Sequence, residues 1–508
     1  MKHIRKLLAS VLAIAMLCGM FAGSAFAASK DTLNVALGGE PTSLDPQGSS
    51  GMNDRRVCRQ IYETLVTQDQ DMNIQPGLAT SWEYTDDTTI VFHLRENVKW
   101  HNGESFTAAD VLYSLNRCVN SSYTKSYSNM IDLENTVATD DYTVVVKLKQ
   151  PYAPILANLA FTALSITNQK AVEEGGEQYG RNPVGTGPFK FIKWVAGDRI
   201  ELEVFDEYWG EKPAFSKMNI RIISESANRS IELETGGVDI AYELSTNDIG
   251  RIEDNPDTRV ERMPSFAVTF IGFNCDESSV MSDKRLRQAV AYALDTVGIV
   301  NVVYYGAGQV ATGPIPSSVW GYSDEVGSYD YDVEKAKALI AETGIATPIS
   351  VKLYTNETTE RQTIAEIVKN QLGQIGIAVE IVTVEQATYL ATVEAKEEDM
   401  YILSWTTVTG DADFGMYTQY TSGSFGASGN RCYYYSPEAD EALGTGRSST
   451  DNATRLEAYK KAQQIIVEDV PAYYLWQGES LFGLSSRVQG FVNMPNTLVS
   501  LAGITFAD

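Results

Sequence analysis

The sequence alternates between β-strand patterns and amphipathic helix patterns. A helix pattern over residues 361–375, with apolar side chains at three- and four-residue spacing, is followed by a strand pattern over residues 378–384. The first half shows the same order, with a helix pattern over residues 227–235 and a strand pattern over residues 239–242. Strands and helices that alternate along a chain are typical of α/β proteins. We therefore predict an α/β fold.

The length of the chain predicts more than one domain. It has 508 residues, of which 44% are hydrophobic, and this is too many for one ordinary core. A strand pattern over residues 266–273 leads to Asn274, where we place the first crossing between two lobes. We predict a first lobe over residues 28–273, a second lobe over residues 274–484, and a C-terminal segment over residues 485–508 that returns to the first lobe.

The N-terminal residues have the pattern of a secretory signal. Three basic residues precede an apolar run over residues 7–21, and residues 25–27 form a cleavage site. The run is shorter than the roughly 20 residues that span a bilayer, which argues against an uncleaved anchor. Lipidation at Cys18 is an alternative, although the two residues before it are larger than lipoprotein signals allow. We predict that residues 1–27 are removed and that the mature protein is periplasmic or extracellular.

Acidic residues outnumber basic residues. The net charge is −26, and removal of the three basic residues of the signal, which has no acidic residue, makes it −29. No basic run interrupts this excess, and a polyanion repels the phosphate backbone of nucleic acids. We therefore predict no nucleic-acid partner.

The reactive side chains lack the common signatures of catalysis. One of the three histidines lies in the signal, and His93 and His101 do not form an HExxH pair. No GxSxG nucleophile elbow occurs, and residues 182–189 are glycine-rich without the lysine of a phosphate-binding loop. Asp411 and Asp413 keep a secreted hydrolase open as an alternative. We predict that the protein is not an enzyme and has no cofactor, catalytic residue or metal site.

Four cysteines remain after removal of the signal, and none belongs to a CxxC pair. In an oxidising compartment, one or two disulfides are expected. Of the three possible pairings we prefer Cys58 with Cys118 and Cys275 with Cys432. The alternative is that some of these residues are buried thiols that pack as small apolar side chains.

Residues 400–417 are the main candidate for a binding segment. A short strand pattern breaks at Trp405 into a threonine-rich turn that contains Asp411 and Asp413. Turns at strand ends are where α/β proteins place groups that contact a ligand. We predict that this segment lines a cleft between the lobes and that Trp405 stacks on a small polar solute or, alternatively, packs in a core. The aspartates either bind an ammonium group or cap the turn.

Four further residues are candidates for contact with the ligand. Arg361 and Arg431 fit a carboxylate because a guanidinium group can donate two parallel hydrogen bonds to it. Arg361 begins a helix, where the helix dipole favours acids, so a role other than helix stability is expected. Arg431 could equally be a surface residue. Tyr127 and Tyr417 are candidates for the walls of the cleft.

Five segments, in order along the chain, carry a family likeness: residues 41–46, 98–111, 183–189, 286–294 and 494–497. They resemble the peptide-type (family 5) extracellular solute-binding proteins of ABC importers. The resemblance implies a two-lobed, periplasmic-binding-protein-like fold of class II, or cluster C, with an extra subdomain near residues 57–185 in the first lobe. It also implies a monomer whose lobes close on a ligand and deliver it to the permease subunits of an ABC transporter.

The resemblance leaves the ligand open within the family, which includes oligopeptide, dipeptide, glutathione and nickel binders. Dipeptide and oligopeptide members place an aspartate three residues after the tryptophan, where this chain has Val408. The pattern from Trp405 to Phe414 is similar to that of glutathione-binding members. Nickel-type members use a histidine beyond the tryptophan, and none follows His101 here. The implied ligand is a short peptide or a glutathione-like zwitterion, with a nickel chelate or another small solute as the alternative.

Overall fold

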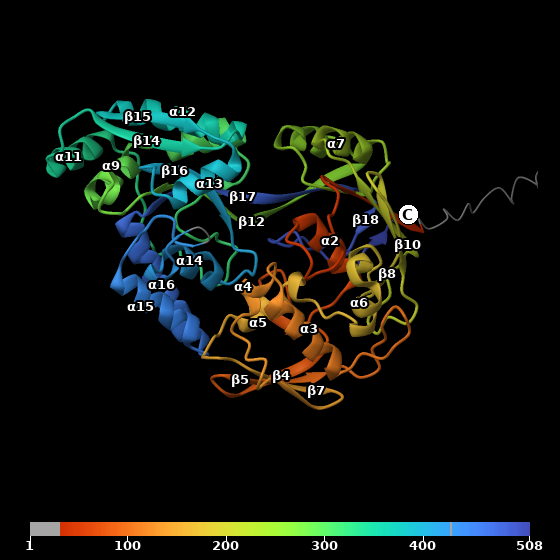
Figure 1. Ribbon diagram of the computed structural model, residues 1–508. Helices are drawn as coiled ribbons and strands as arrows, with labels where there is room; N and C mark the ends of the chain where they lie inside the picture. The colour runs from red at the N-terminus through yellow and green to blue at the C-terminus, as the bar shows by residue number, and fades with distance from the viewer. Residues whose placement is uncertain (1–30, 427–428, 508) are drawn as a thin grey trace, which may run out of the picture.

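The computed structural model describes residues 31–426 and 429–507, shown in Figure 1. An eleven-stranded sheet joins two lobes. Its strands lie in the order β15 (Ile377–Thr383), β14 (Ile349–Thr355), β16 (Met400–Thr406), β12 (Thr258–Phe273), β17 (Ala472–Ser485), β11 (Ile240–Tyr242), β1 (Thr32–Leu37), β10 (Lys217–Ile222), β9 (Arg199–Val204) and β8 (Phe189–Val195). The strand β13 (Gln309–Val310) pairs with β17 beside this path.

Two long strands, β12 and β17, pass from one lobe to the other and pair with each other within both lobes (Figure 1). We call the lobe on the β8 side lobe I and the lobe on the β15 side lobe II. The register of the pair shifts between Pro264 and Val268. A second shift lies between Thr269 and Phe270, and such irregularities disrupt the ladder and bend the strands.

Lobe II has a hydrophobic core on each face of its sheet. Successive residues of β16 alternate between the two cores, with Met400 and Ile402 in one and Tyr401 and Leu403 in the other, as the two-residue period of a strand requires. The helices that complete these cores are α9 (Lys284–Ala293), α10 (Thr296–Tyr304), α11 (Val333–Thr343), α12 (Thr359–Gly373), α13 (Gln386–Glu394), α14 (Ala412–Tyr420), α15 (Pro437–Ser448) and α16 (Asn452–Asp469).

Lobe I is built in the same way around β1, whose residues Val35 and Ala36 face different cores. The C-terminal segment packs on the larger of these cores through Val499 and Leu501. The remaining elements of this lobe are α2 (Met52–Ile61), α6 (Gln169–Gly175), α7 (Ser226–Glu234), α8 (Ile249–Glu253), β18 (Val488–Gln489) and β19 (Thr505–Phe506).

A separate hydrophobic core, formed by residues between Leu65 and Ile166 together with Leu498, defines a subdomain beside lobe I. A four-stranded antiparallel sheet and three helices surround it: β4 (Ala79–Asp86), β5 (Thr89–Leu94), β7 (Thr143–Lys147), β6 (Val137–Asp140), α3 (Ala108–Asn120), α4 (Lys125–Ser128) and α5 (Ile155–Ala160). A short hairpin of β2 (Val66–Gln68) and β3 (Ile74–Pro76) connects it to α2. Figure 1 shows this subdomain below lobe I and next to α14 of lobe II.

The predicted alternation of helices and strands is confirmed. The helix predicted over residues 361–375 is α12, and the strand predicted over residues 378–384 is β15. The shorter pair predicted in the first half corresponds to α7 and β11. The predicted signal peptide lies outside the described residues. Among the residues that the structure describes, no helix combines the length and apolar character needed to cross a membrane.

The predicted disulfides are wrong in this structure, where all four cysteines of the described chain are free thiols. Cys58 packs in the core of lobe I and Cys118 in the core of the subdomain, so the two belong to different cores. Cys275 and Cys432 are joined by a backbone hydrogen bond of 2.8 Å, but the Cys432 thiol lies 3.1 Å from the Tyr401 hydroxyl. The alternative of buried thiols describes these residues better.

Candidate ligand-binding site

The loop after β16 lies where the two lobes meet. Residues 407–411 connect β16 to α14. Gln68 of β2 donates a hydrogen bond from Nε2 to the carbonyl oxygen of Thr409, at 2.9 Å. Gly410 has a φ of +72°, and a Cβ at this position would lie only 2.8 Å from the sulfur of Met72. The close approach of this loop to the β2–β3 hairpin therefore requires glycine.

Four aromatic rings from both lobes form a continuous row across the junction. Trp405 stacks on Phe414 with ring centroids 5.6 Å apart, and Phe414 stacks on Tyr127 of the subdomain at 5.4 Å. Tyr127 in turn contacts Phe161 at 5.1 Å. We call these four residues the aromatic row. Two of the predicted candidates, Trp405 and Tyr127, are thus brought together through Phe414, although 278 positions separate them, from 127 to 405.

Three polar atoms near the start of the loop are buried without a hydrogen-bond partner among the described residues. They are Nε1 of Trp405, Oγ1 of Thr407 and Oγ1 of Thr409. Buried polar groups are paired in the great majority of native proteins, so an unpaired one calls for a water or a ligand as its partner. A cluster of three within five residues is the feature expected of a binding surface rather than of a closed core.

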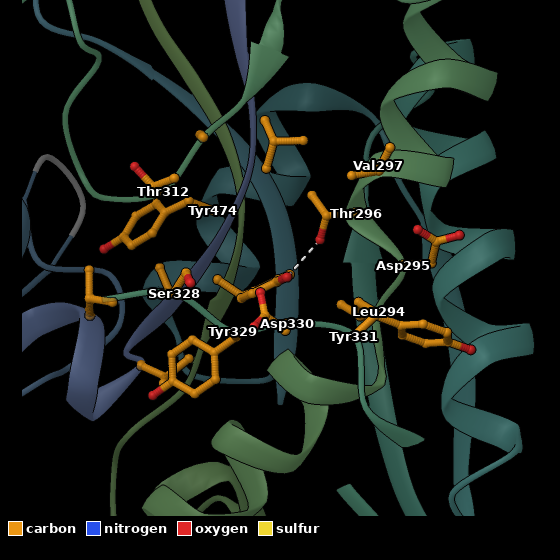
Figure 2. A pocket seen from close by; sticks show the side chains of 16 residues that line it. Leu294, Asp295, Thr296, Val297, Thr312, Ser328, Tyr329, Asp330, Tyr331 and Tyr474 are labelled. Atoms are coloured by element: carbon orange, nitrogen blue, oxygen red, sulfur yellow. Dashed lines mark hydrogen bonds between the residues drawn. The ribbon is translucent and has the colours of Figure 1, made fainter. Parts of the chain in front are cut away.

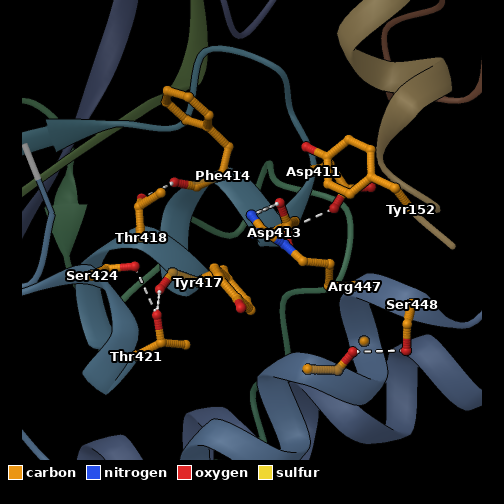
Figure 3. A network of polar contacts seen from close by, with 12 residues as sticks. Tyr152, Asp411, Asp413, Phe414, Tyr417, Thr418, Thr421, Ser424, Arg447 and Ser448 are labelled. Atoms are coloured by element: carbon orange, nitrogen blue, oxygen red, sulfur yellow. Dashed lines mark hydrogen bonds and ion pairs between the residues drawn. The ribbon is translucent and has the colours of Figure 1, made fainter. Parts of the chain in front are cut away.

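Asp413 forms a buried ion pair with Arg447 of α15 (Figure 3). Arg447 donates from Nε and Nη2 to the two carboxylate oxygens, each at 2.8 Å, and its Cζ lies 3.3 Å from the ring centroid of Tyr417. Its carbonyl oxygen accepts a hydrogen bond from the N–H of Ala153 in the subdomain, at 2.9 Å. Burial lowers the pKa of Arg447, but its contacts with Asp413 and two tyrosines together raise it above the ordinary value. This pair ties α14, α15 and the subdomain together.

Asp411 caps α14 and forms a second buried ion pair. Its carboxylate accepts a hydrogen bond from the N–H of Asp413 at 3.0 Å and contacts Nη2 of Arg455 at 2.8 and 2.9 Å. Arg455 also lies over the ring of Trp320, with Cζ 4.4 Å from the centroid. Both aspartates therefore have an arginine partner inside the protein. This arrangement favours the alternative that they hold the turn over direct contact with a ligand ammonium group.

Arg361 and Arg431 lie in the same part of lobe II. Nη2 of Arg361 is 3.5 Å from Oγ of Ser404 in β16. Burial raises the pKa of Tyr389, and the positive charges of Arg361 and Arg431 both act in the opposite direction. The Tyr389 hydroxyl donates a hydrogen bond to a carbonyl oxygen of β16. Of the two residues predicted to bind a carboxylate, Arg361 therefore lies beside the strand that carries Trp405.

A hollow of about 390 Å³ opens between the lobes beside the loop. Asp411, Arg455 and Trp320 form its lobe II wall, and the β2–β3 hairpin, β4 and the α5 region form the opposite wall. Burial raises the pKa of Tyr84 in this wall to about 12, an effect that Arg455 opposes. The hollow shows that the two lobes face each other across a space that contains charged and aromatic side chains.

A second cavity, of about 210 Å³, lies within lobe II and is lined by none of residues 405–417 (Figure 2). Its lining is mainly apolar and tyrosine-rich, and the hydroxyl groups of Thr296 and Tyr473 are hydrogen-bonded to each other at 2.6 Å. No residue of lobe I contributes to this cavity. It is therefore separate from the junction.

Four residues of the junction have no local sequence signal: Arg55, Phe161, Arg447 and Arg455. Each belongs to an ordinary helix or turn pattern and meets residues 405–417 or the aromatic row only through packing of distant segments. Among the predicted candidates, Trp405, Asp411, Asp413, Tyr127 and Tyr417 lie at the junction, and Arg361 and Arg431 lie near it in lobe II.

Comparison with known proteins decides the family. The model of the bacterial extracellular solute-binding proteins, family 5, matches residues 73–427. The chain belongs to this family. It is 29% identical over 483 residues to the glutathione-binding protein GsiB of Pectobacterium atrosepticum, covering 93% of each chain. It is 30% identical over 480 residues to the probable D,D-dipeptide-binding periplasmic protein DdpA of Escherichia coli, covering 92% of this chain and 93% of the relative.

The family fold extends over nearly the whole structure. The solved structure of HbpA2 from Haemophilus parasuis superimposes with a TM-score of 0.87 at 25% identity, covering 94% of this chain and 100% of that chain. The predicted two-lobed α/β fold of a periplasmic binding protein is therefore confirmed. As a member of family 5, the chain is an extracytoplasmic solute-binding protein, and proteins of this kind bind solutes without catalysing a reaction.

Proposed function

We propose that the protein captures a short peptide or a glutathione-like zwitterion between its lobes and delivers it to the permease subunits of an ABC transporter. The observation that carries this proposal is the cluster of unpaired, buried polar atoms at Trp405, Thr407 and Thr409 beside the aromatic row. Aromatic rings supply apolar contact area, and a few polar groups with unused hydrogen-bonding capacity supply orientation, which is the usual composition of a small-ligand site.

The proposed lobes are residues 28–273 and 274–484, with the subdomain near residues 57–185 attached to the first lobe and residues 485–508 returning to it. The two strands that join the lobes, β12 and β17, lose regular pairing between Pro264 and Val268. This register shift supports a hinge between the lobes at that point. The mature protein is proposed to be a monomer, secreted by removal of residues 1–27 to the periplasm or the cell exterior.

The charges of the junction support a ligand with at least one carboxylate. Arg361 and Arg431 both act electrostatically on Tyr389 in lobe II, and the carboxylates of Asp411 and Asp413 pair with Arg455 and Arg447. The names of the relatives point to the same chemistry, since one binds glutathione and the other is a probable D,D-dipeptide binder. A nickel chelate or another small solute of the family remains the second candidate ligand.

The same ion pairs argue against chemistry on the ligand. A carboxylate that acts as nucleophile or general base needs an oxygen available to the substrate. Both oxygens of Asp413 accept hydrogen bonds from Arg447, and both oxygens of Asp411 contact Arg455. We therefore propose that the protein returns its ligand unchanged.

A thermal-unfolding screen tests the proposal. Glutathione, D-Ala-D-Ala, L-dipeptides, L-tripeptides and a nickel–histidine chelate are each added in excess. A ligand at 100 times its Kd stabilises the native state by about 2.7 kcal/mol. Stabilisation by a peptide or glutathione supports the proposal, stabilisation by the chelate alone supports the second candidate, and recovery of a hydrolysed ligand by mass spectrometry would overturn the binding-only reading.

A pair of variants locates the site. Trp405→Phe removes the indole Nε1 at the junction, whereas Trp476→Phe is the control because Trp476 stacks on Tyr304 at 3.8 Å and donates its Nε1 hydrogen bond to Ala307 within lobe II. We expect roughly a tenfold loss of affinity for Trp405→Phe, the value of one hydrogen bond, and no loss for Trp476→Phe. Equal effects of the two variants would place the ligand elsewhere.

A further inference from the structure

Two adjacent arginines of α2 differ completely in their surroundings. Arg56 is 5% exposed and fully engaged, because it donates hydrogen bonds to Asn53, Glu243 and Thr497. Arg55 is 6% exposed, but its side chain makes no hydrogen bond or ion pair with any residue that the structure describes, and its Nε is buried and unpaired. The difference is specific to Arg55, since both residues belong to the same turn of the same helix.

No acidic side chain among the described residues forms an ion pair with Arg55. The neighbouring Asp54 is already engaged by Thr42, whose backbone N–H and hydroxyl each donate to its carboxylate at 2.7 Å. Arg55 makes a cation–π contact with Phe161, in which its Cζ lies 4.7 Å from the centroid of the ring. Burial lowers the pKa of Arg55, and the nearby negative charge of Asp54 offsets this effect only in part. A single cation–π contact does not replace the hydration of a guanidinium group.

Arg55 stands at the lobe I end of the aromatic row. Phe161, which it covers, contacts Tyr127, and Tyr127 stacks on Phe414 of lobe II. The opposite end of the row is Trp405, whose Nε1 is also buried without a partner in the described chain. Unused donors therefore lie at both ends of a row that crosses from one lobe to the other.

We propose that Arg55 binds a carboxylate of the ligand from the lobe I side of the junction. The inference rests on the proposed function and deepens it, because it assigns a ligand carboxylate to Arg55 in lobe I, rather than to Arg361 or Arg431 in lobe II. A guanidinium group offers several donors in a planar fork that matches the two oxygens of a carboxylate. Such a contact supplies the ion-pair partner and the hydrogen-bond acceptors that Arg55 lacks among the described residues.

The test compares ligands that differ in one carboxylate. Glutathione is paired with its glycine-amide derivative, and Ala-Ala with Ala-Ala amide, and calorimetry gives the affinity of each for the mature native protein, for Arg55→Met and for Arg56→Met. For the native protein we expect the acid to bind roughly 10- to 100-fold more tightly than the amide. Arg55→Met should reduce this ratio to near one, whereas Arg56→Met should preserve it.

A folding readout keeps the result interpretable. Arg55→Met removes a buried charge that has no ion-pair partner among the described residues, so the ligand-free variant should unfold at the same temperature as the native protein or a higher one. A lower unfolding temperature with an unchanged acid-to-amide ratio would show that Arg55 only supports the packing of α2 and would overturn the inference. An unchanged ratio while the native protein still binds peptide refutes Arg55 alone, whereas no binding of either probe by the native protein refutes the proposed function as well.

Discussion

Replacing Asp413 by asparagine separates a structural aspartate from a ligand-binding one. The substitution keeps the shape of the side chain and removes its charge, so that Arg447 is left beside Tyr417 without a counter-ion. The side chains of Asp413 and Arg447 are 3% and 16% exposed. Loss of one partner of a buried ion pair destabilises a protein by about 3–5 kcal/mol. The partial exposure of Arg447 and its cation–π contact with Tyr417 place the expected loss near the lower limit, at about 3 kcal/mol.

A double-variant cycle in urea, followed by tryptophan fluorescence and circular dichroism, measures this loss. Asp413→Leu combined with Arg447→Met removes both charges, and we expect it to regain most of the stability that Asp413→Asn loses. Ligand affinity should recover together with stability. A loss below about 1 kcal/mol for Asp413→Asn, accompanied by weaker binding that the double variant does not restore, would show instead that Asp413 contacts the ligand.

Three other predictions follow from single features of the structure. Burial raises the pKa of Glu398 to about 8, so the native state holds this proton after the unfolded chain has released it. The free energy of unfolding should therefore fall as pH rises from about 4.5 to 8. Glu398→Gln should remove this pH-dependent part of the stability, which thermal unfolding of both proteins at pH 5 and pH 8 checks. Gly410→Ala places a Cβ 2.8 Å from the Met72 sulfur at a φ of +72°, so we expect the free energy of unfolding to fall by about 1–3 kcal/mol. Calorimetry should also show weaker ligand binding, and unaltered binding would show that the loop is not part of the site. The four cysteines of the described residues are free, so a thiol reagent should label four groups per mature chain in urea, and a reducing agent should not change the unfolding temperature.

The helices and strands were predictable because they depend on the spacing of apolar side chains over short stretches of the sequence. The helix α12 and the strand β15 follow from side-chain spacing within a dozen residues, and the observed bounds differ from the predicted ones by one or two positions. A turn after the strand was predictable for the same reason, but it covers residues 407–411, because Trp405 still belongs to β16 and Asp413 to α14. Its surroundings were not, because the partners of Asp411 and Asp413 are arginines of α16 and α15, which reach the turn only when the helices pack. The pairing of Cys58 with Cys118 failed for a related reason, since sequence spacing does not show that the two residues enter different cores.

The aromatic row explains how a small solute could set the position of two large lobes. Its central contact, between Phe414 and Tyr127, joins lobe II to the subdomain, and the unused donors of Trp405 and Arg55 lie on opposite sides of that contact. A ligand shifts a conformational equilibrium only by the difference between its affinities for the two states. A zwitterion that contacts lobe II through Trp405 and lobe I through Arg55 makes both contacts only while the lobes are together. The closed state is therefore stabilised by the ligand contact with both lobes, and one of these two contacts is lost when the lobes move apart at the β12–β17 connection.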